Sequence, residues 1–288
     1  MYSKAPFMRL PTCVLLLLMG LFCGAKPLLG QLPFYTDDPA VTDRGKWHFE
    51  FFNELDALQS SQFPDLRQNI ANFKLNYGLP HNLELDFDVP YLSVSRATGV
   101  PSSAGIGDTN LGLKWEFHKA SESSRLPALA VSFYTEFPTG DTKKQLSSGL
   151  TDYWLNFIVQ KPLSRKTRIN GNFGYLFAGN TGTGVLGIQT VRGHVYTGGL
   201  SVLHDFTSRL TLGIEAYGGL SSNDALGRSQ LQFLAGGEYQ LRSGLALTFG
   251  LLSGKYVASP RMGGQIGFAM DCPDIFRRRA KLDRNLTP

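Results

Sequence analysis

The sequence predicts an all-β protein: a transmembrane antiparallel up-and-down β-barrel of about twelve strands with both termini in the periplasm. Three observations carry this prediction. Apolar and polar residues alternate along most of the chain, the alternating runs are about ten residues long, and long and short connections between them alternate. A period of two places successive side chains on opposite faces of a strand, and a tilted strand needs about 9–11 residues to span a membrane.

The first element, residues 1–30, has the features of a secretory signal. Positive charges precede the apolar run Cys13–Cys23, and small residues follow at Ala25 and Gly30. The run is too short to cross a hydrocarbon core of about 30 Å as a helix, which takes about 20 residues. We therefore expect cleavage after Ala25 or Gly30 and export of the remaining chain.

Residues 31–45 separate the signal from the first strand and contain Asp37, Asp38 and Asp43. Three carboxylates so close in sequence could bind Ca²⁺ through their oxygens, but their spacing does not match a twelve-residue calcium loop. We expect a solvated periplasmic segment here.

The barrel itself is expected over residues 46–270. Its clearest strand is Leu83–Tyr91, in which apolar residues alternate with Glu84, Asp86 and Asp88. A helix would scatter these acids around its circumference. The same pattern predicts strands at 46–55, 66–77, 83–92, 109–117, 128–137, 153–160, 167–177, 194–204, 210–220, 229–241, 245–253 and 262–270.

The connections and the aromatic residues agree with a membrane barrel. Connections that follow odd-numbered strands are the longer ones, and the short ones contain turn residues, as at 78–82 and 242–244. Short periplasmic turns and longer extracellular loops are typical of outer-membrane barrels. Aromatic residues fall near both ends of the strands, as the two interfacial girdles of such a barrel require: Tyr77, Trp115, Phe117 and Tyr239 at one end and Tyr91, Phe137, Tyr153 and Phe177 at the other.

The net charge of +5 does not indicate a nucleic-acid partner. The excess of Lys and Arg lies in residues 1–30 and in the tail 271–288, and the rest of the chain has equal numbers of acidic and basic residues. Neutralising phosphates requires a basic surplus, which the barrel lacks. We expect the basic tail to be a periplasmic extension. The mean hydropathy of −0.10 excludes a helical membrane protein but not a barrel, because lipid-facing and lumen-facing residues average out.

No motif in the sequence indicates an enzyme, a cofactor or a metal site. Once the signal is removed, Cys272 is the one cysteine left. Ser201 and His204 have opposite strand parity and cannot act together on one face. Residues 182–187 match G-x-G-x-x-G, but the β-branched, glycine-broken stretch that follows does not predict the helix that a dinucleotide site needs.

If the apolar faces meet lipid, the opposite faces meet the lumen. The lumen-facing candidates for a solute path are Glu84, Asp86, Asp88, Lys114, Glu116, Glu136, Arg168, Glu215 and Glu238, to which the same parity adds His48, Glu50 and Lys74. Because most of these are acidic, an open pore would favour cations or neutral polar solutes. The alternative is a lumen plugged by charge pairs, with Lys114 facing the acids of residues 84–88.

Several short motifs resemble a known family. They are the stretches 32–39 (LPFYTDDP), 45–50 (GKWHFE), 77–85 (YGLPHNLEL), 105–114 (GIGDTNLGLK) and 137–141 (FPTGD). The mature chain, over about 32–270, resembles the outer-membrane transporters grouped as the phenol-degradation meta-pathway family. The resemblance implies a barrel and a solute channel in the outer membrane of a Gram-negative-type bacterium, without implying particular functional residues.

Our leading functional hypothesis is an outer-membrane channel for the passive diffusion of small aromatic or hydrophobic solutes. The expected partners are outer-membrane lipid, a small-molecule solute and the barrel-assembly machinery. Barrel proteins commonly end in an aromatic residue that the assembly machinery recognises, whereas here the last strand is expected to stop near Phe268 to Met270 and the tail 271–288 follows. Phe268 would then have to serve as an internal signal. The second hypothesis is a structural or assembly barrel with a charge-plugged lumen, and the third is a soluble periplasmic β-protein.

Overall fold

A computed structural model of the chain describes residues 33–59, 67–95, 102–120, 126–178, 192–221, 230–256 and 259–272. The expected signal, the G-x-G-x-x-G stretch and nearly all of the basic tail lie outside the described residues. The strands are β1 (Trp47–Ala57), β2 (Arg67–Leu79), β3 (Leu83–Ser95), β4 (Ser103–Ile106), β5 (Thr109–His118), β6 (Ala128–Phe137), β7 (Asp152–Pro162), β8 (Thr167–Ala178), β9 (Gly193–Asp205), β10 (Leu210–Ser221), β11 (Gln230–Arg242), β12 (Leu245–Gly254) and β13 (Met262–Cys272).

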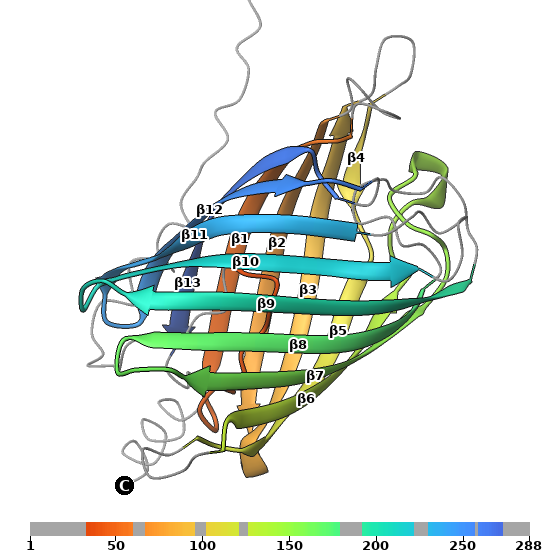
Figure 1. Cartoon of the computed structure of the whole chain (residues 1–288). Helices are drawn as coiled ribbons and strands as arrows, with labels where there is room; N and C mark the ends of the chain where they lie inside the picture. Colours follow the sequence, from red (N-terminus) through yellow and green to blue (C-terminus); the bar gives the residue numbers. More distant parts are fainter. Residues whose placement is uncertain are drawn as a thin grey trace, which may run out of the picture.

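The strands form one closed antiparallel barrel (Figure 1). Apart from β4 and β5, each strand pairs with its neighbours in sequence, and β1 also pairs with β13 over its full length, from Trp47 opposite Cys272 to Ala57 opposite Met262. β4 and β5 share one position, because β3 pairs with β4 through Tyr91–Val94 and with β5 through Leu83–Asp88. The barrel therefore has twelve strand positions, as predicted.

The interruption between β4 and β5 was not predicted, and β4 was assigned to a loop. Its cause is Pro90 in β3, which has no N–H to donate to the neighbouring strand. Opposite Val89 and Pro90 the partner strand has three residues, 107–109, so it bulges by one residue. The Pro90 carbonyl still accepts a hydrogen bond from Gly107 N at 2.9 Å.

The other predicted strands are confirmed within three residues at each end. Apart from β4, they are 10 to 13 residues long, the length that a tilted membrane strand needs. Tight connections such as 163–166, 206–209 and 243–244 lie at one end of the barrel, and a longer one, 138–151, lies at the other. Two one-turn 3₁₀ helices, Pro80–Asn82 and Thr142–Lys144, occur in connections. Among the described residues no helix is long and apolar enough to cross a bilayer.

The two faces of the wall differ in chemistry as the period of two predicts. Large apolar side chains on the outer face are exposed, including Phe87, Leu113, Phe133, Phe157, Phe173, Ile214, Phe233, Leu251 and Ile266. Inward side chains are buried and mostly polar, for example Glu84, Asn156, Ser201 and Thr248. Because a water-soluble protein rarely exposes so many large apolar groups together, this outer face is suited to lipid.

The chain that precedes β1 lies inside the barrel. We call residues 33–42 the inner segment. Its residues contact side chains of β1, β3, β5 and β10, which are distributed around the ring of strands, so only a position in the lumen allows all of these contacts. Phe34, Thr36 and Asp37 are buried. The expectation of a solvated periplasmic segment at 31–45 was therefore wrong for these residues, because Glu215 accepts the backbone N–H groups of Tyr35 and Thr36 and Phe34 packs on leucine side chains.

Candidate functional site in the barrel lumen

Glu215 holds the first part of the inner segment. This carboxylate projects inward from β10 and accepts hydrogen bonds from the backbone N–H groups of Tyr35, at 3.1 Å, and Thr36, at 2.5 Å. From the other side of the lumen, Glu54 in β1 accepts a 2.5 Å bond from the Tyr35 hydroxyl. Hydrogen bonds to a charged acceptor are stronger than neutral ones, so two carboxylates fix Tyr35.

Lys114 connects the wall to the inner segment. Its Nζ lies 3.2 Å from Oε1 of Glu84 and 3.4 Å from Oδ1 of Asp37, and all three side chains are buried. The pairing of β3 with β5 places Glu84 directly opposite Lys114. The other oxygen of Glu84 accepts a 2.6 Å bond from the backbone N–H of Thr42. A single ion pair in the wall therefore contacts the inner segment at two points.

The apolar beginning of the inner segment packs on a thin part of the wall. Phe34 forms a buried cluster with Leu203, Leu234 and Leu252. Glycines permit this close approach: a Cβ at Gly213 would lie 2.8 Å from Cζ of Phe34, closer than real Cβ contacts allow. Pro33 lies on Gly236 and Gly250 of the next two strands in the same way, 3.0 and 3.4 Å from the positions a Cβ would take.

The middle of the inner segment also lies against β8 and β9, the two strands that follow β10 around the barrel. A Cβ placed on Gly199 of β9 would lie 2.4 Å from Oγ1 and 3.4 Å from Cβ of Thr36. The side-chain amide of Asn172 in β8 faces the backbone of Asp37.

At the mouth formed by the tight turns, Gly45 N donates to Gly78 O at 2.8 Å and Gly78 N donates to Lys46 O at 3.1 Å. These bonds tie the chain that follows the inner segment to the end of β2.

Burial shifts the proton affinity of two groups in the inner segment. Burial raises the pKa of the Asp38 carboxyl from 3.8 to about 6; nearby Asp37 raises it further, whereas Lys114 acts in the opposite direction. Burial and the carboxylate of Glu54 raise the pKa of the Tyr35 hydroxyl well above its usual range. The phenol is therefore a hydrogen-bond donor at neutral pH.

Of the nine residues predicted for a solute path, Glu84, Asp86, Lys114, Glu116, Glu215 and Glu238 are buried, and Asp88, Glu136 and Arg168 are partly buried. The expected pairing of Lys114 with Glu84 is present. Asp86 instead accepts a 2.7 Å bond from Tyr134, and Arg168 pairs with Asp205 at 2.9 Å. Glu116 pairs with Lys119 at 3.3 Å near the tight-turn end.

The remaining predicted residues are not gathered into one site. Glu136 lies opposite Asp152 across β6 and β7. Glu238 lies on β11, where one carboxylate oxygen has no hydrogen-bond partner among the described residues. The sequence analysis missed Tyr35, Thr36 and the inward role of Asp37. The one available signal was the apolar Pro33-Phe34-Tyr35 stretch, which is unusual for a solvated segment.

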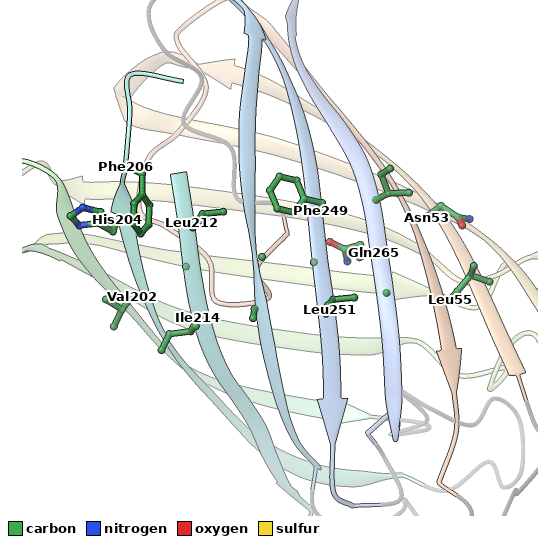
Figure 2. A pocket seen from close by; sticks show the side chains of 16 residues that line it. Asn53, Leu55, Val202, His204, Phe206, Leu212, Ile214, Phe249, Leu251 and Gln265 are labelled. Atoms are coloured by element: carbon green, nitrogen blue, oxygen red, sulfur yellow. The ribbon is translucent and has the colours of Figure 1, made fainter. Parts of the chain in front are cut away.

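The outer face carries an apolar depression of about 880 Å³. Figure 2 shows its lining, with Leu212 and Ile214 on β10 and Phe249 and Leu251 on β12. The wall behind it includes Gly213, Gly236 and Gly250, the glycines on which Pro33 and Phe34 pack. At this place only glycine backbone separates the lipid-facing surface from the inner segment.

The fold, with its apolar outer face and polar lumen, is that of an outer-membrane β-barrel. Two solved structures that are similar in fold are an outer-membrane channel and a porin. The COG4313 outer membrane channel from Pseudomonas putida F1 has a TM-score of 0.66 at 16% identity, with 82% of this chain and 98% of that chain covered. The NanC porin follows, with a TM-score of 0.51 at 9% identity and coverage of 76% and 98%.

Residues 59–270 match the model of the family described as "Putative MetA-pathway of phenol degradation", and the chain belongs to that family. A comparison with curated proteins found no significant match. The similar structures are channels and porins rather than enzymes, and at these identities they show the fold alone.

Proposed function

We propose that the protein is a diffusion channel for small aromatic or hydrophobic solutes, closed by the inner segment and opened when that segment leaves the lumen. The observation that carries the proposal is the way the segment is held. Its backbone and side chains bind to wall carboxylates and Lys114 through polar contacts, and water in an open lumen would replace such contacts at small net cost.

Two features support an aromatic or hydrophobic solute. The family description refers to phenol degradation, and the apolar depression lies on the lipid-facing wall directly behind Phe34. The acidic lumen residues would disfavour anionic solutes, because carboxylates raise the local concentration of cations and lower that of anions. Neutral aromatic compounds agree with the family description and the apolar depression, and they carry no negative charge that the acidic lumen would repel.

A disulfide between the inner segment and the wall tests the opening step. Because a Cβ at position 199 would lie 3.4 Å from Cβ of Thr36, Thr36→Cys with Gly199→Cys places two cysteines near disulfide geometry. The pair is introduced with Cys272→Ser, which removes the one cysteine of the described residues. The single variants Thr36→Cys and Gly199→Cys are the controls.

We expect the oxidised pair to abolish both conductance in planar bilayers and arabinose-driven liposome swelling, and reductant to restore them. In cells, uptake of the apolar aromatic probe N-phenyl-1-naphthylamine should fall on oxidation and recover on reduction, while the single variants should not respond. If neither state passes any solute, the channel proposal fails and the structural or assembly barrel is the better interpretation. If both states conduct equally, solute does not need the segment to leave.

A further inference from the structure

The inner wall carries a pair of acidic side chains that the function proposed above does not use. Glu54 and Asp56 lie two residues apart on β1, so both point into the lumen. Both are buried, and the carboxyl of Asp56 lies within hydrogen-bonding reach of Glu54. None of the ion pairs formed by the described residues includes either acid.

Two buried amide side chains complete this cluster. Gln68 of β2 lies directly opposite Asp56, and Gln265 of β13 lies directly opposite Glu54, to which it donates a 2.8 Å hydrogen bond from Nε2. Directly paired residues project to the same face of the sheet about 4.5–5.5 Å apart. Gln68 is only 3% exposed and Gln265 only 5%.

The cluster presents oxygen atoms that lack donors. Oδ1 of Asp56, Oε1 of Gln68 and Oε1 of Gln265 have no hydrogen-bond partner within the part of the chain that the structure describes. A buried acceptor without a partner is destabilising, so three on one face of the wall require an explanation. Asp56 leans over Gly263, where a Cβ would lie 2.1 Å from Oδ1, so glycine at 263 makes room for this arrangement.

We propose that Glu54, Asp56, Gln68 and Gln265 form a binding site for a hard divalent cation such as Ca²⁺. Carboxylate and carboxamide oxygens are the ligands that Ca²⁺ prefers, and water can complete its six to eight positions. The charge of the cation would balance the two carboxylates. No group of three or more His, Cys, Asp or Glu residues suited to a metal occurs among the described residues; here two of the four ligands are amides.

The site borders the inner segment through the Tyr35 hydroxyl, which is hydrogen-bonded to Glu54. Tyrosine close to bound Tb³⁺ transfers excitation to it, so Tb³⁺ can serve as the probe for Ca²⁺. The folded full-length protein in detergent should give saturable Tb³⁺ emission on excitation of tyrosine, and Ca²⁺ should displace the lanthanide. Calorimetric titration with Ca²⁺ measures the affinity without any conductance assay.

Asp56→Asn and Gln68→Leu should each weaken Tb³⁺ and Ca²⁺ binding at least tenfold. Glu116→Gln, which removes a carboxylate near the opposite end of the lumen, should leave binding unchanged. Heat-modifiable migration in SDS gels checks the fold of each variant, and Gln265→Leu replaces any variant that does not fold. Equal affinity in all variants, absence of saturable emission, or displacement by putrescine but not by Ca²⁺ would each overturn the proposal, the last in favour of an organic-amine site.

Discussion

The ammonium group of Lys114 lies between Glu84 of the wall, at 3.2 Å, and Asp37 of the inner segment, at 3.4 Å. One buried cation therefore serves two carboxylates that belong to different parts of the barrel. Without it, each would lose the one ion pair that it forms among the described residues. Removal of one partner of a buried ion pair is far more damaging than replacement of the whole pair by apolar groups.

Replacement of Lys114 by Met should therefore favour the open state. The closed state, in which the inner segment occupies the lumen, should be destabilised by about 3–5 kcal/mol, because Glu84 and Asp37 then repel each other. Single-channel recording in planar bilayers should show longer open times than for the unmodified protein. Asp37→Asn keeps the wall pair intact and should have a smaller effect. A Lys114→Met channel that stays closed as long as the unmodified one would contradict this prediction.

Glu215→Gln should loosen the inner segment where it binds Tyr35 and Thr36. A carboxylate accepts both backbone N–H groups with its two oxygens, whereas an amide has one oxygen and an NH₂ group that cannot accept. A cysteine at position 36, in the Cys272→Ser background, should react with a maleimide at least ten times faster in this variant. Glu238→Gln makes the same chemical change on β11 and should leave the rate unchanged; equal acceleration in both variants would show a general loosening of the barrel.

The conductance should depend on pH through Asp38. The pKa of the Asp38 carboxyl is about 6 when the inner segment is seated in the lumen, above its ordinary value of 3.8. Between about pH 4 and pH 6 the seated state therefore binds more protons than the state in which the segment has left the lumen. Seating is therefore most stable below about pH 4 and becomes less stable as the pH rises to about 6. Open probability should increase over this interval, and Asp38→Asn should remove that part of the increase. An Asp38→Asn channel with an unchanged pH profile would assign the effect to other lumen groups.

Leu251→Arg tests whether the outer face meets lipid. Leu251 is 72% exposed on β12, and an arginine at the midplane of a membrane barrel costs about 2–4 kcal/mol. Urea unfolding from lipid vesicles should show a loss of this order. Leu126→Arg, at a leucine that is 60% exposed in the connection before β6, should change stability little. Equal, small effects of both substitutions would favour a soluble β-protein.

The sequence was sufficient to predict the barrel because the alternation within each strand shows which of its faces is polar and which is apolar. In β3, alternation of apolar residues with Glu84, Asp86 and Asp88 fixes which side is buried, whatever its neighbours are. Even β9, where either face could have been apolar in the sequence, resolves in the structure with Thr197 and Ser201 buried inward. β4 was missed because its end depends on Pro90 in another strand.

The inner segment could not be predicted in the same way. Its conformation has no period of its own and follows from Glu215, Lys114 and Glu84, which are distant in sequence and meet only after the barrel has formed. Asp56 lies just beyond the predicted end of its strand at residue 55, so its inward orientation beside Glu54 was not anticipated. The alternation of residues along the chain determines the strands, whereas the position of the inner segment in the lumen depends on residues that are distant in sequence.

The two backbone hydrogen bonds that join Gly45 and Lys46 to Gly78 have a consequence for the order of folding. β1 and β13 are the first and last strands, so the ring can close only when the whole chain is available, and contacts of such long sequence range form late. Gly78 lies near the end of β2, which pairs with its sequence neighbour β3, so it can hold the chain that follows the inner segment before that closure. Ring closure on a segment already held at its base would avoid later threading of residues 33–42 through the narrow mouth.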